Sequence, residues 1–230
     1  MIYGIGDLHF DFSKKKPMDI FGDNWINHEE QIVNNWKELV KEEDLVLIAG
    51  DVSWSLRLNQ AYFDLERIDK LLGKKIISKG NHDYWWESLS KMNGLNLPSI
   101  SFLHNNFYQY KNTSIHGTRG WLSRDSDDFK PEDEKIFNRE LLRLKMSLDL
   151  GKDMLVEKKI VMIHYPPFNK DSSPNEFVKL MRDYGVDICV YGHLHADGHK
   201  YAVEDTIEGI KFHCISSDYI GFVPKLILGN

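Results

Sequence analysis

Residues 188–195 read Ile-Cys-Val-Tyr-Gly-His-Leu-His, a short apolar run that ends in a glycine and two histidines. A run of this length, rich in β-branched and aromatic residues and closed by a turn residue, predicts a buried strand. Glycine lets the chain turn sharply and pass close to a ligand, and histidine is a common metal ligand. The stretch therefore predicts a strand whose carboxyl end carries a ligand-binding loop.

Four further apolar runs have the same form, and each is followed closely by Asp, Asn or His. Asp and Asn are also common in turns and helix caps, and any one of these signals alone is compatible with that role. Ligands bind at the carboxyl ends of strands in open α/β sheets, so five such signals in order favour one shared site. The four loops are Gly6-Asp7-Leu8-His9 after residues 2–5, Gly50-Asp51 after residues 45–49, Gly80-Asn81-His82-Asp83 after residues 76–77, and His164 after residues 160–163.

These loops offer oxygen and imidazole donors and no thiolate. Such a donor set suits divalent ions such as manganese, iron or zinc. A purely structural site would instead be closed and rich in thiolates. The pattern therefore predicts a metal centre that is not purely structural.

Helical periodicity separates the predicted strands. Apolar residues recur at helical spacing over residues 29–41, 61–72 and 131–150. The alternation of strands and helices indicates a layered α/β fold, which we expect to form one domain over residues 1–230. Residues 100–117 and 199–228 break the alternation and are expected to form consecutive short strands in antiparallel hairpins.

The composition excludes several classes of protein. The chain has 230 residues, 42% of them hydrophobic and 28% charged, which is too apolar for disorder. Its formal net charge of −6 argues against a broad electrostatic grip on long nucleic acid. Neither a secretory signal nor an apolar run long enough to span a membrane is present, so no membrane partner is expected. Two cysteines without a CxxC pair favour a reducing, cytoplasmic location.

Five blocks between Gly6 and His195 resemble the calcineurin-like metallophosphoesterase superfamily and follow one another in the order typical of that family. They are GDLH, GDVSW, GNHD, the His164 of MIHYPP, and GHLH. The resemblance implies a four-layered α/β/β/α sandwich with two mixed sheets, in which the second sheet uses the two strand-rich stretches. It also implies two divalent ions. The first would be held by Asp7, His9, Asp51 and His195, and the second by Asp51, Asn81, His164 and His193, with Asp51 shared.

The same resemblance assigns catalytic roles. His82 would face the phosphate as an acid or charge stabiliser, and Asp83 would orient it through its other ring nitrogen. Two ions about 3.5–4 Å apart would generate a bridging hydroxide that attacks phosphorus. The implied activity is hydrolysis of phosphate esters, as a phosphomonoesterase or a phosphodiesterase.

Contacts to the substrate are less well marked. Arg57 and Arg119 are candidate phosphate clamps, and each is equally consistent with an ordinary surface or helix-start arginine. Trp54 and Trp121 are candidates for an aromatic rim, although packing of the ligand loops is the simpler interpretation. We expect a small phosphate ester as substrate. The alternative is a non-catalytic scaffold of the same fold that binds partners, which would be expected to have lost ligands. The oligomeric state is open.

Overall fold

The computed structural model describes residues 1–229 and contains two mixed β-sheets. The first sheet has the order β11-β1-β2-β3-β4, and β11 is its antiparallel member. The second has the order β5-β6-β7-β8-β10-β9, with parallel central strands and antiparallel edges. The strands are β1 (Ile2–Ile5), β2 (Leu45–Ile48), β3 (Lys74–Ser78), β4 (Ile100–Leu103), β5 (Tyr108–Tyr110), β6 (Thr113–Thr118), β7 (Lys158–Ile163), β8 (Ile188–Tyr191), β9 (Thr206–Ile207), β10 (Ile210–Cys214) and β11 (Lys225–Leu228).

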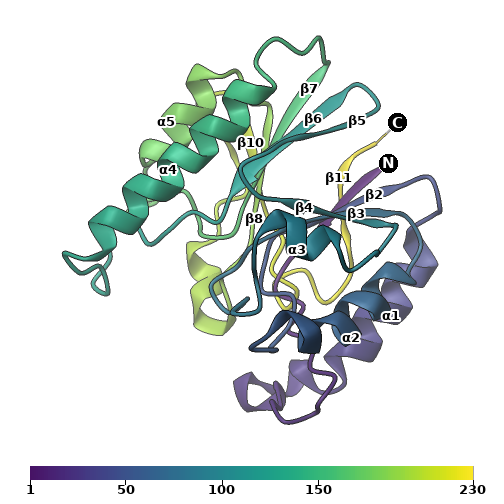
Figure 1. Ribbon diagram of the computed structural model, residues 1–230. Helices are drawn as coiled ribbons and strands as arrows, with labels where there is room; N and C mark the ends of the chain where they lie inside the picture. The colour runs from purple at the N-terminus through teal and green to yellow at the C-terminus, as the bar shows by residue number, and fades with distance from the viewer. Residues whose placement is uncertain (230) are drawn as a thin grey trace.

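Helices cover the outer face of each sheet (Figure 1). The first sheet carries α1 (His28–Leu39), α2 (Leu58–Asp69) and the short α3 (Leu89–Asn93). The second carries α4 (Asp133–Leu150) and α5 (Glu176–Asp183). Three single-turn or two-turn 3₁₀ helices complete the described residues: η1 (Asp19–Phe21), η2 (Asp23–Trp25) and η3 (Ala196–Tyr201).

Three separate apolar layers hold this arrangement together. Leu47 and Ile76 of the first sheet face Ile160 and Val190 of the second in the central layer. Alternate residues of the same strands face the helices, because successive side chains of a strand point to opposite faces. Trp36 belongs to one outer layer, and the other is built on α4 and α5. The predicted α/β/β/α sandwich is thereby confirmed.

Residues 100–117 and 199–228 were expected to supply strands to the second sheet, but the structure divides their strands between the two sheets. β4 and β11 join the first sheet, and the antiparallel hairpins within these stretches are β5–β6 and β9–β10. β10 pairs parallel to β8, so its carboxyl end points the same way as the other central strands. The pairing is non-local and leaves no signal in a short window of sequence.

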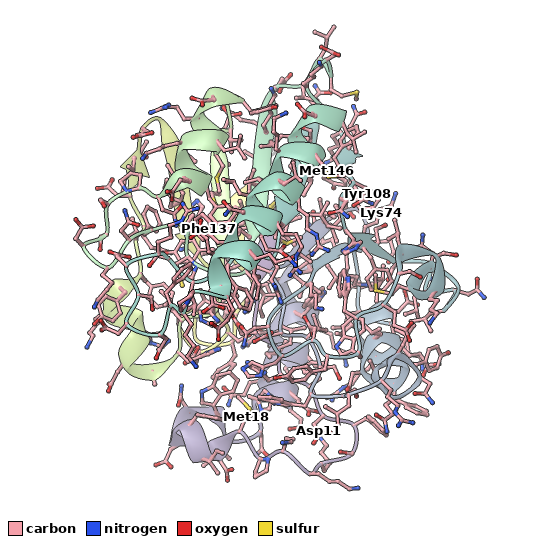
Figure 2. The ribbon with its side chains drawn as sticks, turned by 60° about the vertical axis from the view of Figure 1, so that its left-hand side comes forward. Asp11, Met18, Lys74, Tyr108, Phe137 and Met146 are labelled. Carbon is pink, nitrogen blue, oxygen red and sulfur yellow. The ribbon has the colours of Figure 1, made fainter. Side chains whose placement is uncertain are left out.

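The carboxyl ends of the parallel strands meet at one end of the molecule. Figure 2 shows Asp11 and Met18, which follow β1, near the bottom of the view, and Lys74, at the start of β3, well above them. Asp11 and Met18 mark the end with the carboxyl ends of the strands, and Lys74 lies on the side of the amino ends. The predicted ligand loops lie at the end that Asp11 and Met18 mark. Within residues 1–229 no helix is both long and apolar enough to cross a membrane.

Candidate metal centre

The loops after β1, β2, β3, β7 and β8 converge on one cluster of polar side chains. His195 Nε2 lies 3.5 Å from Asp7 Oδ1, and His164 Nε2 lies 3.6 Å from Asp51 Oδ2. Asn81 Oδ1 lies between two imidazoles, 2.7 Å from His164 Nε2 and 2.9 Å from His193 Nδ1. The structure therefore brings together all seven residues that the sequence marks as candidate ligands: Asp7, His9, Asp51, Asn81, His164, His193 and His195.

Two overlapping groups within the cluster could each hold a divalent ion. Asp7, His9 and His195 form one, and Asp7, Asp51 and His164 form the other, with ligand atoms within 4.8 Å of one another in each. Asp51 Oδ2 also lies 3.9 Å from His9 Nε2, so this carboxylate faces both groups. Asp7 is the residue common to both groups.

The hydrogen bonds of His164 show that the site fits a cation. Its Nδ1–H donates to the carbonyl of Ala49 at 2.8 Å, which leaves a lone pair on Nε2 of the neutral ring. That lone pair faces Asn81 Oδ1, which is also an acceptor. Two acceptors at this distance repel each other unless a proton or a metal ion lies between them. Asp7 Oδ1 and His9 Nδ1 are likewise buried without a hydrogen-bond partner among the described residues.

The protonation states of His9 and His193 suit metal binding as well. Burial lowers the pKa of His9 far below its usual range and lowers that of His193 to about 3, so both rings offer lone pairs. Burial opposes ionisation of Asp7, but His195 and the other nearby imidazoles hold its pKa below the usual range. Burial, reinforced by the charges of Asp83 and Asp7, raises the pKa of Asp51 to about 7. A bound divalent ion would offset this crowding of carboxylates.

Several candidate ligands have an unusual backbone. Asp7, His9, Asp51 and His193 have φ angles of 56°, 48°, 51° and 73°. The left-handed conformation costs roughly 1–2 kcal/mol for a residue with a side chain, and such strain clusters at functional sites. These turns direct the side chains of successive strand ends toward the same point.

Two glycines make room for the carboxylates. A Cβ on Gly80 would lie 2.0 Å from Asp51 Oδ1, and a Cβ on Gly192 would lie 2.5 Å from Asp7 Oδ2. Any side chain at either position would displace a candidate ligand. Glycine at these two positions is thus required by close approach.

The expected pairing of Asp83 with His82 is wrong. The Asp83 carboxylate is fully buried and accepts hydrogen bonds from the main-chain N–H groups of Asp51, Val52 and Gly80 at 2.8–2.9 Å, and from the indole of Trp85 at 3.0 Å. Within residues 1–229 the His82 ring makes no hydrogen bond to it. Neighbours in sequence point to opposite sides of this turn, so Asp83 fixes the loops from beneath.

His82 lies beside the cluster of candidate ligands. Its main-chain N–H donates to Asp51 Oδ1 at 2.8 Å, and its half-exposed ring packs on Trp54 with the centroids 4.7 Å apart. Burial lowers the pKa of His82. Trp54 also stacks on His9 at 4.8 Å, so Trp54 braces two site histidines.

The two arginines differ in their surroundings. Arg57 is exposed at the N-terminus of α2, where its carbonyl accepts the N–H groups of Gln60 and Ala61. Arg119 is largely buried, lies over the ring of Trp121 at 4.3 Å and approaches Glu140 at 3.6 Å. The main-chain carbonyl of Arg119 accepts hydrogen bonds from the N–H groups of His164 and Tyr165, which follow β7. Arg119 therefore supports the loop that carries His164.

Trp121 is anchored at its other end. Its indole N–H donates to Asp133 at 2.9 Å, and its ring lies 5.2 Å from that of Tyr165. The structure therefore gives both Trp54 and Trp121 packing contacts around the ligand loops.

The sequence pattern did not point to Asp218. Its carboxylate accepts a hydrogen bond from His195 Nδ1 at 2.8 Å and lies 3.1 Å from His199 Nε2. Burial alone would lower the pKa of His195, but the charges of Asp7 and Asp218 outweigh burial and raise this pKa to about 10. Asp218 follows β10, so the strand-end rule would have found it had β10 been expected to run parallel to β8.

A family model described as calcineurin-like phosphoesterase matches residues 1–197. The chain belongs to the calcineurin-like phosphoesterase family. With the Asp and His groups described above, membership supports a metal-dependent phosphoesterase in general terms. None of the curated proteins matches the sequence.

Solved structures with the same fold include three bacterial proteins. A protein of unknown function from Aquifex aeolicus has 16% identity and a TM-score of 0.53, with 98% of this chain and 94% of that chain covered. A phosphopantetheinyl hydrolase from Mycobacterium tuberculosis has 14% identity and a TM-score of 0.56, with coverage of 94% and 88%. A protein from Thermus thermophilus has 12% identity and a TM-score of 0.56, with coverage of 84% and 80%. At these identities the likeness is one of fold.

Proposed function

We propose that this family member hydrolyses small phosphate esters with two divalent ions held side by side. The position of Asp51 carries the proposal, since its Oδ2 lies within 4 Å of both His9 Nε2 and His164 Nε2. Asp7, His9 and His195 would complete the first ion's ligands. Asn81, His164 and His193 would complete the second's, and Asn81 adds an oxygen without adding charge.

Ions held there would lower the pKa of bound water, supply hydroxide near neutral pH and attract the phosphate. The chain's own residues prepare that chemistry. Ala49 and Asp218 accept the Nδ1–H groups of His164 and His195, which fixes each ring with Nε2 toward the cluster. Asp83 holds the loops that carry Asp51 and Asn81.

His82 is placed to act on the ester rather than on the ions. Its ring is half-exposed, packs on Trp54 and lies beside the proposed ligands without a carboxylate partner among the described residues. We propose that it protonates the leaving oxygen or stabilises charge on the phosphoryl group. Because its pKa is lowered, protonation would depend on a bound phosphate anion nearby.

Metal removal and replacement tests the function. Purified protein stripped by a chelator should hydrolyse neither phosphomonoesters nor phosphodiesters, and manganese, iron or zinc should restore one of the two activities. The panel should include a phosphopantetheine ester, because one fold relative is named for that substrate. Hydrolysis by fully stripped protein would refute a metal-dependent mechanism. Tight metal binding without hydrolysis of any ester would favour the scaffold.

A further inference from the structure

An open cleft of about 440 Å³ begins at the candidate metal centre and extends over the second sheet. Ligand sites for small molecules commonly have a volume of about 300–1,000 Å³. The loops after β6, β7 and β8 form its walls, and His193 belongs to both the cleft and the metal cluster. We call it the Trp121 cleft, after a lining that includes Trp121, Leu122, Ser126, Tyr165, His193 and Leu194.

Aromatic rings in fixed positions connect the metal cluster to the cleft. The ring of Tyr165 lies 4.1 Å from that of His193 and 5.2 Å from that of Trp121. Trp121 is held by its hydrogen bond to Asp133 and by Arg119 over one face. Because these rings are already ordered, a ligand that packs on them loses little further side-chain entropy at the protein.

The outer part of the cleft carries negative charge. Asp127 and Asp128 are exposed there, and Lys170 is the one lysine or arginine among the described lining residues. Its ammonium is paired with Asp127 at 2.7 Å, and its main-chain N–H donates to Asp125. A second anionic group on a ligand would therefore meet carboxylates and, among the described lining residues, no unpaired lysine or arginine at this end.

We propose that the Trp121 cleft binds the alcohol part of the ester, and that this alcohol is uncharged and partly apolar. The inference rests on the proposed function, since the phosphate would lie at the metal cluster and the alcohol would extend past His193. The same geometry disfavours substrates with a second phosphate, such as nucleoside diphosphates and sugar bisphosphates.

Binding of 2-naphthol to stripped protein tests the cleft without hydrolysis. Ser126→Trp should fill the cleft and weaken binding by calorimetry about tenfold or more, which is the contribution of one buried ring. The matched control is Ser90→Trp, at an exposed position of α3 on the other sheet, which should bind like the unaltered chain. Equal binding by both variants would overturn the assignment.

Kinetics with manganese-loaded protein test the substrate class. The unaltered chain should prefer 2-naphthyl phosphate to phenyl phosphate in kcat/KM, and should discriminate against a naphthyl phosphate that carries a sulfonate. The double variant Asp127→Asn/Asp128→Asn should reduce that discrimination about threefold to fivefold, as expected for exposed charges. Hydrolysis without discrimination by size or charge would overturn the cleft's role. Naphthol binding without any hydrolysis would refute the proposed function and leave the binding site established.

Discussion

The main-chain N–H of Asp51 donates to the carboxylate of Asp83 at 2.9 Å, across 32 residues of sequence. The same carboxylate accepts the N–H groups of Val52 and Gly80 and the indole of Trp85. One buried side chain therefore sets the relative position of the loops that follow β2 and β3. Those loops carry a candidate ligand each, so the geometry of the metal cluster depends on a residue that does not face it.

Asp83→Ala should lower the free energy of unfolding by roughly 2–5 kcal/mol, because several buried donors lose their acceptor. Urea denaturation of the metal-stripped protein measures this free energy of unfolding. The control is Asp153→Ala, an exposed position, which should change stability by less than about 0.5 kcal/mol. If the two variants were equally stable, the bracing role of Asp83 would be refuted.

Asp218→Asn should weaken metal binding about 10–100-fold, because the carboxylate that orients His195 becomes a neutral amide. Competition with a metal indicator dye measures affinity, and a melting curve of the stripped protein checks the fold. His199→Ala is the matched control, since it removes the other partner of Asp218 and leaves His195 in place. Unchanged affinity in Asp218→Asn would show that Asp218 does not support the ligand.

Gly80→Ala should reduce the number of ions bound per chain, since the new methyl group would lie 2.0 Å from Asp51 Oδ1. Metal analysis after dialysis measures the loss. Gly198→Ala is the control near the site, because its nearest neighbour would be 3.7 Å away at ordinary contact distance. Full metal content in Gly80→Ala would mean that Asp51 can move without losing its role.

His82→Ala should keep its metal and lose activity unevenly. A general acid contributes about 10²–10⁴-fold and matters most when the leaving alkoxide is basic. The loss in kcat should therefore be large for an alkyl phosphate and clearly smaller for 4-nitrophenyl phosphate. Equal losses would assign His82 to the phosphoryl oxygens instead, and loss of an ion would make it a ligand.

The strand-end loops could be predicted from the sequence because their signals are local. An apolar run followed within a few residues by Gly and Asp, Asn or His marks both the strand and its ligand, as in residues 45–51. The structure places all of these loops at one end of the two sheets. Helix boundaries near residues 29–41 and 131–150 followed from periodicity for the same reason.

What the sequence concealed depends on non-local pairing and on side-chain direction. β10 runs parallel to β8, and only that pairing brings Asp218 to His195. Asp83 adjoins His82 in sequence, but the turn directs its carboxylate into the interior. Adjacency in a tight loop does not determine which side chains meet.

Metal analysis of the unaltered chain and of Asp51→Asn, paired with their hydrolysis rates, tests the central claim most directly. We predict two divalent ions per chain in the unaltered protein, and weakened binding at both positions with loss of turnover in Asp51→Asn, because one carboxylate faces both ligand groups. Two ions at full occupancy and a near-normal rate in Asp51→Asn would contradict the account.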